Sequence, residues 1–599
     1  MVVQERRYLP HRVRREDRDD GAVILRSGHP MGPVDPTVGT WLDRWAEARA
    51  ETVFLAERSG PGWRALSYAQ TREAVRSIAA ALLERGLGPD NPIVIISGNS
   101  VDHGLLMLAA HYIGVPVVPL AEQYALIPAA HAQLRHCVGL VRPRVVFADD
   151  GARYGAALGL DVFDGMEKIV SANPDPGMTE FASLLHAHDP AGVDAAAAGV
   201  GPDTVAKYLM TSGSTAHPKG VITTHGMMCA NQTMIADALT FLRDRPPVIL
   251  DWLPWNHVFG GSHNFNMMLA NGGSLYIDNG KPVKGLVERT IENLRLQTGT
   301  MAFNVPLGFA MVRDALKADA GLRQRYFEDL DMIFYAGASL PQDVWADLAE
   351  MAREVRGDVP LMTSSWGMTE TAPACLIVHE PTTRSGIIGV PMTGVDIKLI
   401  PEADGRYDLR VRGPNVTLGY FEDPAKTAEL FDNEGFLISG DAVKFVDPDW
   451  PELGLVFDGR MSEDFKLISG TWVRAANLRL ELLPLLGGLA SDVVVCGADR
   501  AEIGLMIFPT PEAREMAEES DGTLWSEALA GALHARLAKR GEQGSASRVA
   551  RVLVLAEPPS MGEGEITAKG NLNFRKILSR RADLLDRLYD ESNMQVIRT

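Results

Sequence analysis

Residues 208–220 read Tyr208-Leu-Met-Thr-Ser-Gly-Ser-Thr-Ala-His-Pro-Lys-Gly220. The apolar run from Val205 to Met210 predicts a short buried strand, and the loop after it carries hydroxyls, a glycine and a lysine. Backbone N–H groups and hydroxyls in such a loop can form a concave anion site, which a glycine lets the backbone approach closely. The stretch therefore predicts a polyphosphate site formed by Thr211, Ser212, Gly213, Ser214, Thr215 and Lys219.

The loop does not have the spacing of a Walker A motif, because no G-x-x-x-x-G-K-S/T pattern occurs in it. This disfavours a P-loop ATPase or kinase. A Ser/Thr/Gly-rich stretch by itself is more often an ordinary surface loop. The rest of the sequence therefore has to decide between a phosphate site and a simple loop.

Four further motifs follow the loop along the chain. They are Trp366-Gly-Met-Thr-Glu370, Ser439-Gly-Asp441, Gly459-Arg460 with Lys466, and Ile566-Thr-Ala-Lys569-Gly570. In this order, and together with residues 208–220, they resemble the signature motifs of the adenylate-forming superfamily, which comprises acyl-CoA synthetases, luciferases and peptide-synthetase adenylation domains. Five matches in the same order over most of the chain are not expected by chance.

The resemblance implies an α/β fold with two domains. A large N-terminal adenylate-forming domain of layered sheets and helices would span residues 36–460, after an N-terminal arm at 1–35. A small, mobile α+β C-terminal domain would span residues 461–599 and carry the catalytic lysine. The family usually has Asp or Lys as the hinge pivot two residues after the arginine of its hinge segment, and here that position is Ser462.

Composition agrees with a large multi-domain globular protein. The chain has 599 residues, is 46% hydrophobic, and carries a net charge of −19 with a pI near 5.3. This charge argues against nucleic acid or an anionic membrane as the main partner. We expect no signal peptide, no membrane insertion and a cytoplasmic location, because the apolar runs are short and the four cysteines form neither a metal nor a disulfide pattern.

Hydrophobic periodicity predicts alternating helices and strands, which is typical of α/β layers. The charged first thirty residues predict an extended segment, with order beginning near Pro36. Predicted helices lie at 41–49, 68–84, 227–239, 525–539 and 574–588, and another opens at Pro341. Predicted strands lie at 92–96, 115–118, 205–210, 221–224, 330–335, 492–496, 505–509 and 552–555.

The resemblance also implies a reaction and its substrates, which are ATP, coenzyme A and a carboxylic acid, with Mg²⁺ as the cofactor. A carboxylate is a poor acyl donor, so it is first converted to an acyl-adenylate with release of pyrophosphate. Lys569 would bridge the carboxylate and the α-phosphate, and Glu370 would bind Mg²⁺. The motifs assign the adenine and ribose to Gly337, Ala338, Trp366, Gly367, Thr369, Asp441 and Arg460.

The segment Leu253-Pro-Trp-Asn-His257-Val-Phe-Gly-Gly-Ser-His263 resembles the part of the family that flanks the acid pocket, with His257 near the reacting carboxylate as a second catalytic residue. Without the resemblance, His257 would more often be a satisfied core histidine. Aromatic and sulfur groups suit a planar ring, and one polar side chain could meet a phenolic hydroxyl. The candidate pocket residues are His257, Phe259, Phe303, Asn304 and Met368.

Several variants in the motifs resemble one branch of the superfamily, the feruloyl-CoA synthetases. They are Phe465-Lys-Leu, Gly470-Thr-Trp-Val473, the Thr-Ala-Lys-Gly form of the lysine motif, and Arg26-Ser-Gly-His-Pro-Met-Gly-Pro33. The branch implies ferulate or a related hydroxycinnamate as the acid. The alternatives are a fatty-acyl or other aryl-CoA synthetase, a luciferase-like oxygenase, and a stand-alone adenylation protein. Only thirty residues follow Lys569, too few for the carrier domain of a peptide synthetase.

Overall fold

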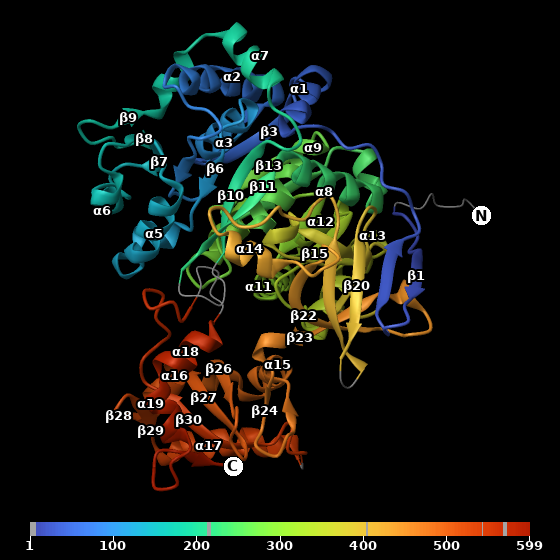
Figure 1. Ribbon diagram of the computed structural model, residues 1–599, viewed down its shortest axis with the longest axis vertical. Helices are drawn as coiled ribbons and strands as arrows, with labels where there is room; N and C mark the ends of the chain where they lie inside the picture. Colours follow the sequence, from blue (N-terminus) through green and yellow to red (C-terminus); the bar gives the residue numbers. More distant parts are fainter. Residues whose placement is uncertain (1–7, 212–216, 403–404, 542, 567–571) are drawn as a thin grey trace.

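The computed structural model describes residues 8–211, 217–402, 405–541, 543–566 and 572–599. These residues form two lobes of sheets and helices (Figure 1). The larger lobe contains the elements up to residue 460, and the smaller lobe, orange to red in the figure, contains those from Phe465 onward. The predicted α/β class, with a large N-terminal and a small C-terminal domain, is confirmed.

A seven-stranded sheet contains the strand that leads into the 208–220 loop. Neighbouring strands are parallel, except that the edge strand β11 runs antiparallel to β10. Short apolar runs that are buried on both faces suit such a sheet. Its order is β11 (Lys219–Thr224), β10 (Val205–Thr211), β6 (Val117–Pro119), β5 (Ile93–Ile95), β7 (Val145–Asp150), β8 (Glu167–Ala172) and β9 (Thr179–Glu180).

Two smaller sheets lie in the same lobe. One has the order β12 (Val248–Asp251), β13 (Ser274–Ile277), β3 (Val53–Ser59) and β4 (Gly62–Ser67). The other is fully parallel, with β14 (Met301–Asn304), β15 (Met332–Tyr335) and β16 (Leu361–Thr363). The loops that follow β12 and β15 carry predicted acid and adenine residues, and β14 itself carries Phe303 and Asn304.

The fourth sheet of the large lobe has nine strands, all antiparallel to their neighbours. Three of its strands, β17, β22 and β23, carry predicted nucleotide residues. Its order is β1 (Val13–Asp17), β2 (Val23–Ser27), β20 (Asp396–Pro401), β21 (Tyr407–Arg412), β22 (Leu437–Phe445), β23 (Leu455–Arg460), β19 (Ile387–Pro391), β18 (Ala374–Ile377) and β17 (Ser365–Gly367).

The first two strands correct the prediction of a separate N-terminal arm. Residues 13–27 are ordered sheet, and β2 pairs with β20 from Val23–Leu399 to Arg26–Asp396. The charged surroundings of this segment concealed one apolar run, Val23 to Leu25, which is almost completely buried. Arg26 completes the pairing by donating from Nε to Asp396 Oδ1 at 2.9 Å.

The helices of the large lobe cover these sheets. The predicted helix at 68–84 has the same limits as α2, because Ser67 and Gln70 form a capping box at its start. The helices are α1 (Val38–Ala48), α2 (Tyr68–Glu84), α3 (Val101–Tyr112), α4 (Glu122–Leu126), α5 (His131–Val141), α6 (Gly155–Leu158), α7 (Pro190–Ala198), α8 (His225–Ala238), α9 (Phe265–Ala270), α10 (Val287–Leu296), α11 (Pro306–Ala318), α12 (Ala320–Glu328), α13 (Gln342–Arg356) and α14 (Pro424–Leu430).

The small lobe is an α+β unit built on a six-stranded mixed sheet. A two-stranded hairpin, β24 (Phe465–Lys466) with β25 (Trp472–Val473), precedes it. The sheet consists of β26 (Ala490–Cys496), β27 (Ile503–Pro509), β30 (Val549–Leu555), β29 (Thr523–Trp525) and β28 (Glu518–Ser520), with β31 (Ile597–Arg598) beside β30. Its helices are α15 (Ala475–Leu486), α16 (Pro511–Glu515), α17 (Glu527–Leu537), α18 (Phe574–Arg580) and α19 (Ala582–Leu588).

The predicted continuous helix at 574–588 is wrong, because it is broken at Arg581. Arg581 leaves the helical conformation, with φ −105° and ψ 35°. Its guanidinium donates from Nε and Nη2 to the two carboxylate oxygens of buried Glu565, both at 2.7 Å. This bidentate pair is stronger than a neutral hydrogen bond and anchors Arg581 at the break between α18 and α19.

Each lobe has its own hydrophobic core. The large core cluster draws its buried residues from Val13 to Leu455, whereas two clusters in the small lobe draw theirs from Leu467 to Ile597. Direct contact between the lobes includes Gln133, which donates to the carbonyl oxygens of Met561 and Gly562 at 3.3 and 3.0 Å. No helix in the described ranges is long and apolar enough to cross a membrane.

Candidate active site

Trp366 on β17 and Asp441 in the middle of β22 meet on the nine-stranded sheet. The indole Nε1 donates to Asp441 Oδ2 at 2.9 Å, and both side chains are buried. The other carboxylate oxygen, Oδ1, has no hydrogen-bond partner within the described chain, and lies 3.4 Å from Nε of the exposed Arg460. Burial raises the pKa of Asp441, while Arg460 and Trp366 oppose that rise. The site therefore holds a buried acceptor beside an exposed cation.

The turn after Trp366 fixes the position of the Trp366 ring, and it requires glycine at position 367. A Cβ on Gly367 would lie 1.8 Å from the carbonyl oxygen of Pro373. The next turn is closed by Met368, whose N–H donates to Thr371 Oγ1 at 2.9 Å, and Thr369 is buried between them. Three predicted residues, Gly367, Met368 and Thr369, thus belong to one tight backbone unit.

Glu370 and Lys219, which are far apart in the sequence, meet around Tyr420. The Tyr420 hydroxyl donates to Glu370 Oε1 at 3.0 Å, and Lys219 Nζ lies 4.8 Å from the centre of the Tyr420 ring. Burial, followed by the charge of Glu370, raises the pKa of Tyr420. Tyr420 was not predicted from the sequence, since it lies outside the recognised motifs. It joins the lysine of the 208–220 loop to the predicted metal carboxylate.

The described part of the phosphate loop consists of its two ends. Thr211 closes β10 and pairs with Lys219 at the start of β11. Ser212, Gly213, Ser214 and Thr215 lie outside the described residues, and so does Lys569.

The loop after β15 is open to solvent at the predicted adenine residues. Gly337 and Ala338 are both exposed, and Gly337 has φ +87°, a conformation that favours glycine. Their contact with adenine stays a prediction.

On the acid side, residues Phe259–Asn264 form a π-helical turn after β12. Such turns recur at functional sites. His257, which is half-buried, precedes the turn; its Nδ1 accepts from the N–H of Phe259 at 3.3 Å, and its carbonyl oxygen accepts from Gly261 at 2.8 Å. The turn thus positions His257 and Phe259 together.

Aromatic rings from three strands and loops cluster beside this turn. The Phe303 ring lies 6.2 Å from Phe259 and 5.2 Å from Phe334, while Phe259 and Phe334 are 5.6 Å apart. His263 lies in contact with all three rings. The structure therefore brings two predicted pocket residues together and adds His263 and Phe334.

His263 is neutral, and its tautomer follows from its neighbours. Burial lowers its pKa to about 4. Asn264 donates its Nδ2 to Asp251 Oδ2 at 2.9 Å, so its Oδ1 is the atom that faces His263 Nδ1, also at 2.9 Å. Nδ1 therefore carries the proton, and Nε2 is an acceptor with no hydrogen-bond partner within the described chain. Burial also raises the pKa of Asp251, to about 7.

Asn304 is already engaged through its carbonyl oxygen. Oδ1 accepts from Trp252 Nε1 at 3.1 Å and from the N–H of Val305 at 2.9 Å. A substrate contact from Asn304 would therefore come from its amide nitrogen, as a donor.

Ser462 is exposed in the short turn Met461–Glu463 that separates β23 from the small lobe. Burial raises the pKa of Glu463, and Asp464 accepts from Arg406 at 2.5 Å. The assignment of Ser462 as the pivot stays a prediction.

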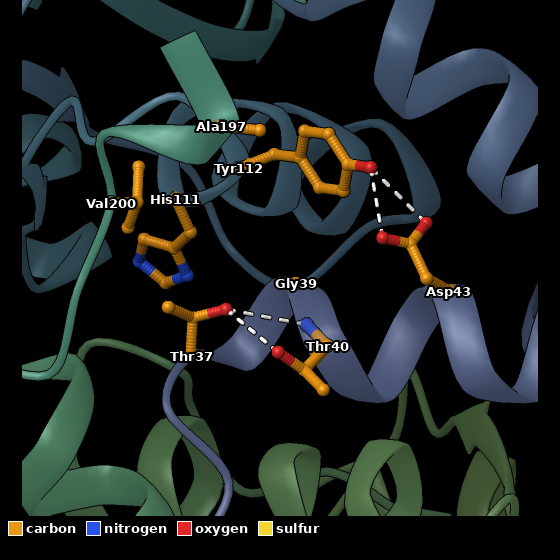
Figure 2. A pocket seen from close by; sticks show the side chains of 8 residues that line it. All are labelled: Thr37, Gly39, Thr40, Asp43, His111, Tyr112, Ala197 and Val200. Carbon is orange, nitrogen blue, oxygen red and sulfur yellow. Dashed lines mark hydrogen bonds between the residues drawn. The ribbon is translucent and has the colours of Figure 1, made fainter. Parts of the chain in front are cut away.

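A cavity of about 150 Å³ lies elsewhere, between α1 and α3 (Figure 2). Among its polar groups, Tyr112 donates to the carboxylate of Asp43, and Thr37 accepts from the N–H of Thr40. Its lining shares no residue with the predicted nucleotide and acid residues. Within the described ranges, no cluster of three His, Cys, Asp or Glu residues forms a metal site.

Three curated proteins illustrate which known sequences this chain is similar to. The chain is 26% identical over 390 residues to 3-[(3aS,4S,7aS)-7a-methyl-1,5-dioxo-octahydro-1H-inden-4-yl]propanoyl:CoA ligase of Rhodococcus jostii (strain RHA1), covering 63% of this chain and 71% of that protein. It is 27% identical over 406 residues to luciferin 4-monooxygenase of Photinus pyralis, covering 63% and 68%. It is 30% identical over 297 residues to 4-coumarate-CoA ligase 2 of Narcissus pseudonarcissus, covering 46% and 49%.

Solved structures share the fold at low identity. An anthranilate CoA ligase in complex with anthranoyl-AMP superposes with a TM-score of 0.71 at 18% identity, covering 93% of this chain and 99% of that one. A family model described as AMP-binding enzyme matches residues 42–421, which is more than half of the chain and includes the phosphate loop, Trp366, Glu370 and Tyr420. The chain therefore belongs to the AMP-binding enzyme family.

Proposed function

We propose that this protein is an ATP-dependent acid:CoA ligase. It converts a carboxylic acid and ATP to an acyl-adenylate and pyrophosphate, and then transfers the acyl group to the thiol of coenzyme A with release of AMP. The observation that carries the proposal is the meeting of Lys219 and Glu370 at Tyr420, because it joins a phosphate-loop cation to a buried carboxylate. The similarity to proteins named as CoA ligases supports the thioester as product.

The nucleotide roles follow from the contacts at the site. Asp441 Oδ1 is a buried acceptor without a hydrogen bond in the described chain, which suits a ribose hydroxyl, and the exposed Arg460 reaches the same region. The indole N–H of Trp366 is already used by Asp441, so its ring face is what remains for adenine. Lys219 and Thr211, with the hydroxyls between them, bind the β- and γ-phosphates.

Glu370 suits a magnesium site in which the phosphates of the nucleotide supply the other ligands. Mg²⁺ is commonly held by one or two carboxylates plus substrate phosphate oxygens rather than by an all-protein cage. Glu370 offers one buried carboxylate, with Oε1 oriented by Tyr420. When bound, the ion would neutralise charge on the phosphates. Tyr420 and Lys219 hold the carboxylate and the loop end in place for it.

Lys569 is proposed to stabilise the charge that develops at the α-phosphate during adenylation. The lobe that carries it would turn about the hinge at Ser462 between the two half-reactions. We expect Lys569→Ala to reduce adenylation at least 100-fold, because removal of one transition-state donor typically costs that much. Thioester formation from supplied acyl-adenylate should change less than threefold, and single-turnover assays of each half-reaction would measure both. Equal loss in both steps would contradict this role.

A hydroxycinnamate such as ferulate is proposed as the acid. The rings of Phe259, Phe303 and Phe334 suit a planar substrate, and His263 Nε2 offers an acceptor for a phenolic hydroxyl. The similarity to a protein named as a 4-coumarate-CoA ligase supports the same class. Other aryl acids and fatty acids are the alternatives, and the similarity to luciferin 4-monooxygenase makes an oxygenase the second candidate.

The deciding experiment is a thioester assay by mass spectrometry with ATP, Mg²⁺ and coenzyme A. The acids are ferulate, 4-coumarate, caffeate, cinnamate, benzoate, and medium- and long-chain fatty acids. Preference for hydroxycinnamates is the expected result. Preference for fatty acids would support the ligase activity and refute the hydroxycinnamate substrate. Acyl-adenylate without thioester, or light emission with oxygen uptake, would refute the ligase.

A further inference from the structure

Lys207 is a fully buried lysine on β10 that no part of the proposed reaction uses. Its Nζ donates to the carbonyl oxygen of Gly261 at 2.7 Å, and its relative exposure is 0%. Within the described chain no carboxylate forms an ion pair with it, and burial lowers its pKa from 10.5 to about 7. The titratable groups that interact with it are His103 and His111 on α3 and His225 on α8. All are buried, and their pKa values are lowered by burial and by the lysine.

The folding stability of the protein does not explain why a lysine occupies this buried position. A buried amine pays a desolvation penalty that one hydrogen bond only partly offsets, and an apolar side chain of similar length would avoid it. The lysine therefore serves a contact that an apolar residue cannot make. That contact is the carbonyl oxygen of Gly261.

Gly261 lies within the π-helical turn Phe259–Asn264, which packs backbone against backbone. A Cβ on Gly261 would lie 2.1 Å from the carbonyl oxygen of Trp255. A second side chain secures the same turn, because Gln232 Nε2 on α8 donates to the carbonyl oxygens of Ser262 and His263 at 3.1 and 3.3 Å. Three successive carbonyl groups of the turn are thus fixed by two side chains from outside it.

The two ends of the Lys207 contact belong to different halves of the site. Four residues after Lys207, β10 ends at Thr211, where the phosphate loop begins. Gly261 donates its N–H to the carbonyl oxygen of His257, and Phe259 starts the turn. One side chain therefore ties the phosphate strand to the backbone that carries the acid-pocket residues.

We propose that Lys207 is a positioning residue that holds the acid-pocket turn in register with the phosphate strand, so that the carboxylate of the acid meets the α-phosphate. The inference rests on the proposed function and deepens it. Gln232 supports the same turn from α8.

The test compares Lys207→Met, which keeps length and removes the donor, with a matched control. Lys398→Met is that control, since Lys398 is also buried but lies on β20, where it is paired with Asp432 and Glu434. Acid-dependent ATP–pyrophosphate exchange gives separate KM values for acid and ATP, with the best acid of the panel. We expect Lys207→Met to raise the KM for acid at least 10-fold and the KM for ATP less than twofold. Lys398→Met should leave both within twofold.

A second variant and a second measurement test the inference even if the exchange activity is lost. Gln232→Met should raise the KM for acid in the same selective way, about threefold. Hydrogen exchange of residues 253–266 should quicken at least 10-fold in Lys207→Met and stay unchanged in Lys398→Met. Unchanged exchange, or equal changes in both KM values, would overturn the inference. Wild-type protein without exchange activity for any acid would refute the proposed function, while the hydrogen-exchange result would still decide the role of Lys207.

Discussion

His263 shows how one side chain can carry substrate preference. Its Nδ1 is committed to Asn264, and its Nε2 is a buried acceptor without a partner among the described residues. An unpaired buried acceptor costs roughly 1–3 kcal/mol, which a hydroxyl donor on the substrate would recover. Acids with a ring hydroxyl should therefore be preferred over acids without one.

We expect His263→Leu to reduce the preference for 4-coumarate over cinnamate about 10-fold, measured as the ratio of kcat/KM values. Phe334→Leu is the control, because it alters the same aromatic cluster without removing an acceptor. It should affect both acids alike. An unchanged ratio in His263→Leu would show that the hydroxyl contacts another group.

Lys207 predicts a pH dependence of stability. The unfolded lysine titrates at 10.5 and the folded one at about 7, so between these values the unfolded chain binds more protons. Stability relative to Lys207→Met should therefore rise with pH by about 1.4 kcal/mol per unit over this window, and be lowest below pH 7. Urea unfolding of both proteins at pH 7.5, 8.5 and 9.5 measures the difference. A constant difference would mean that the amine is solvated.

Sequence motifs could place residues in a common site where each motif is short and continuous. Trp366 and Asp441 were assigned to one nucleotide site, and the structure joins them directly. Tyr420, Lys207 and His263 were not assigned, because their roles depend on partners from distant segments. For Lys207, its place in an apolar strand is a sequence signal that indicates an unusual buried charge.

At the scale of elements, the tight turn at Gly367 is the most constrained segment of the site. The distance of 1.8 Å from an added Cβ to the Pro373 carbonyl oxygen leaves no room, and that oxygen is backbone. We expect Gly367→Ala to destabilise the protein by about 3 kcal/mol and to raise the KM for ATP, because Trp366 and Thr369 shift with the turn.

Thermal unfolding and ATP kinetics would measure both effects. Gly139→Ala is the control, since an added Cβ meets nothing within 4 Å there and the residue lies inside α5. It should stabilise the protein slightly, by about 0.5–1 kcal/mol. Similar behaviour of the two variants would show that the turn tolerates a backbone shift.

Element prediction succeeded where periodicity was local and failed where a distant partner decided the outcome. The limits of α2 follow from its own cap and apolar spacing. By contrast, the break at Arg581 depends on Glu565, and the ordering of β2 depends on β20. No local pattern at 574–588 or 13–27 contains that information.

For the whole molecule, buried histidines predict loss of stability in mild acid. Burial holds the pKa of several histidines below 6.5. As pH falls, the unfolded chain therefore binds protons at these histidines before the folded chain does, which lowers the stability of the fold. Asp149 and Asp251 oppose this, because burial raises their pKa values to about 6 and about 7. Among the histidines, His103, His225 and His263 titrate at about 4, His379 at about 3, and the pKa of His111 is also lowered.

Each such histidine contributes up to about 3 kcal/mol between pH 6.5 and 4. We therefore expect cooperative unfolding as pH falls through this range, followed by circular dichroism. Substituting His225→Gln should move the midpoint to lower pH. A midpoint below pH 4 in the wild-type protein would mean that the paired carboxylates, rather than the histidines, control acid unfolding.

The pairing of β2 with β20 also has a consequence for synthesis on the ribosome. Val23 lies opposite Leu399, so its partner strand leaves the ribosome much later than β2 does. At roughly 5–20 residues per second, the delay is roughly 20–75 s. Throughout that interval the apolar run Val23 to Leu25 lies at an open strand edge, the kind of surface that chaperones shield. β2 can thus pair with β1 early, whereas its second edge waits for β20.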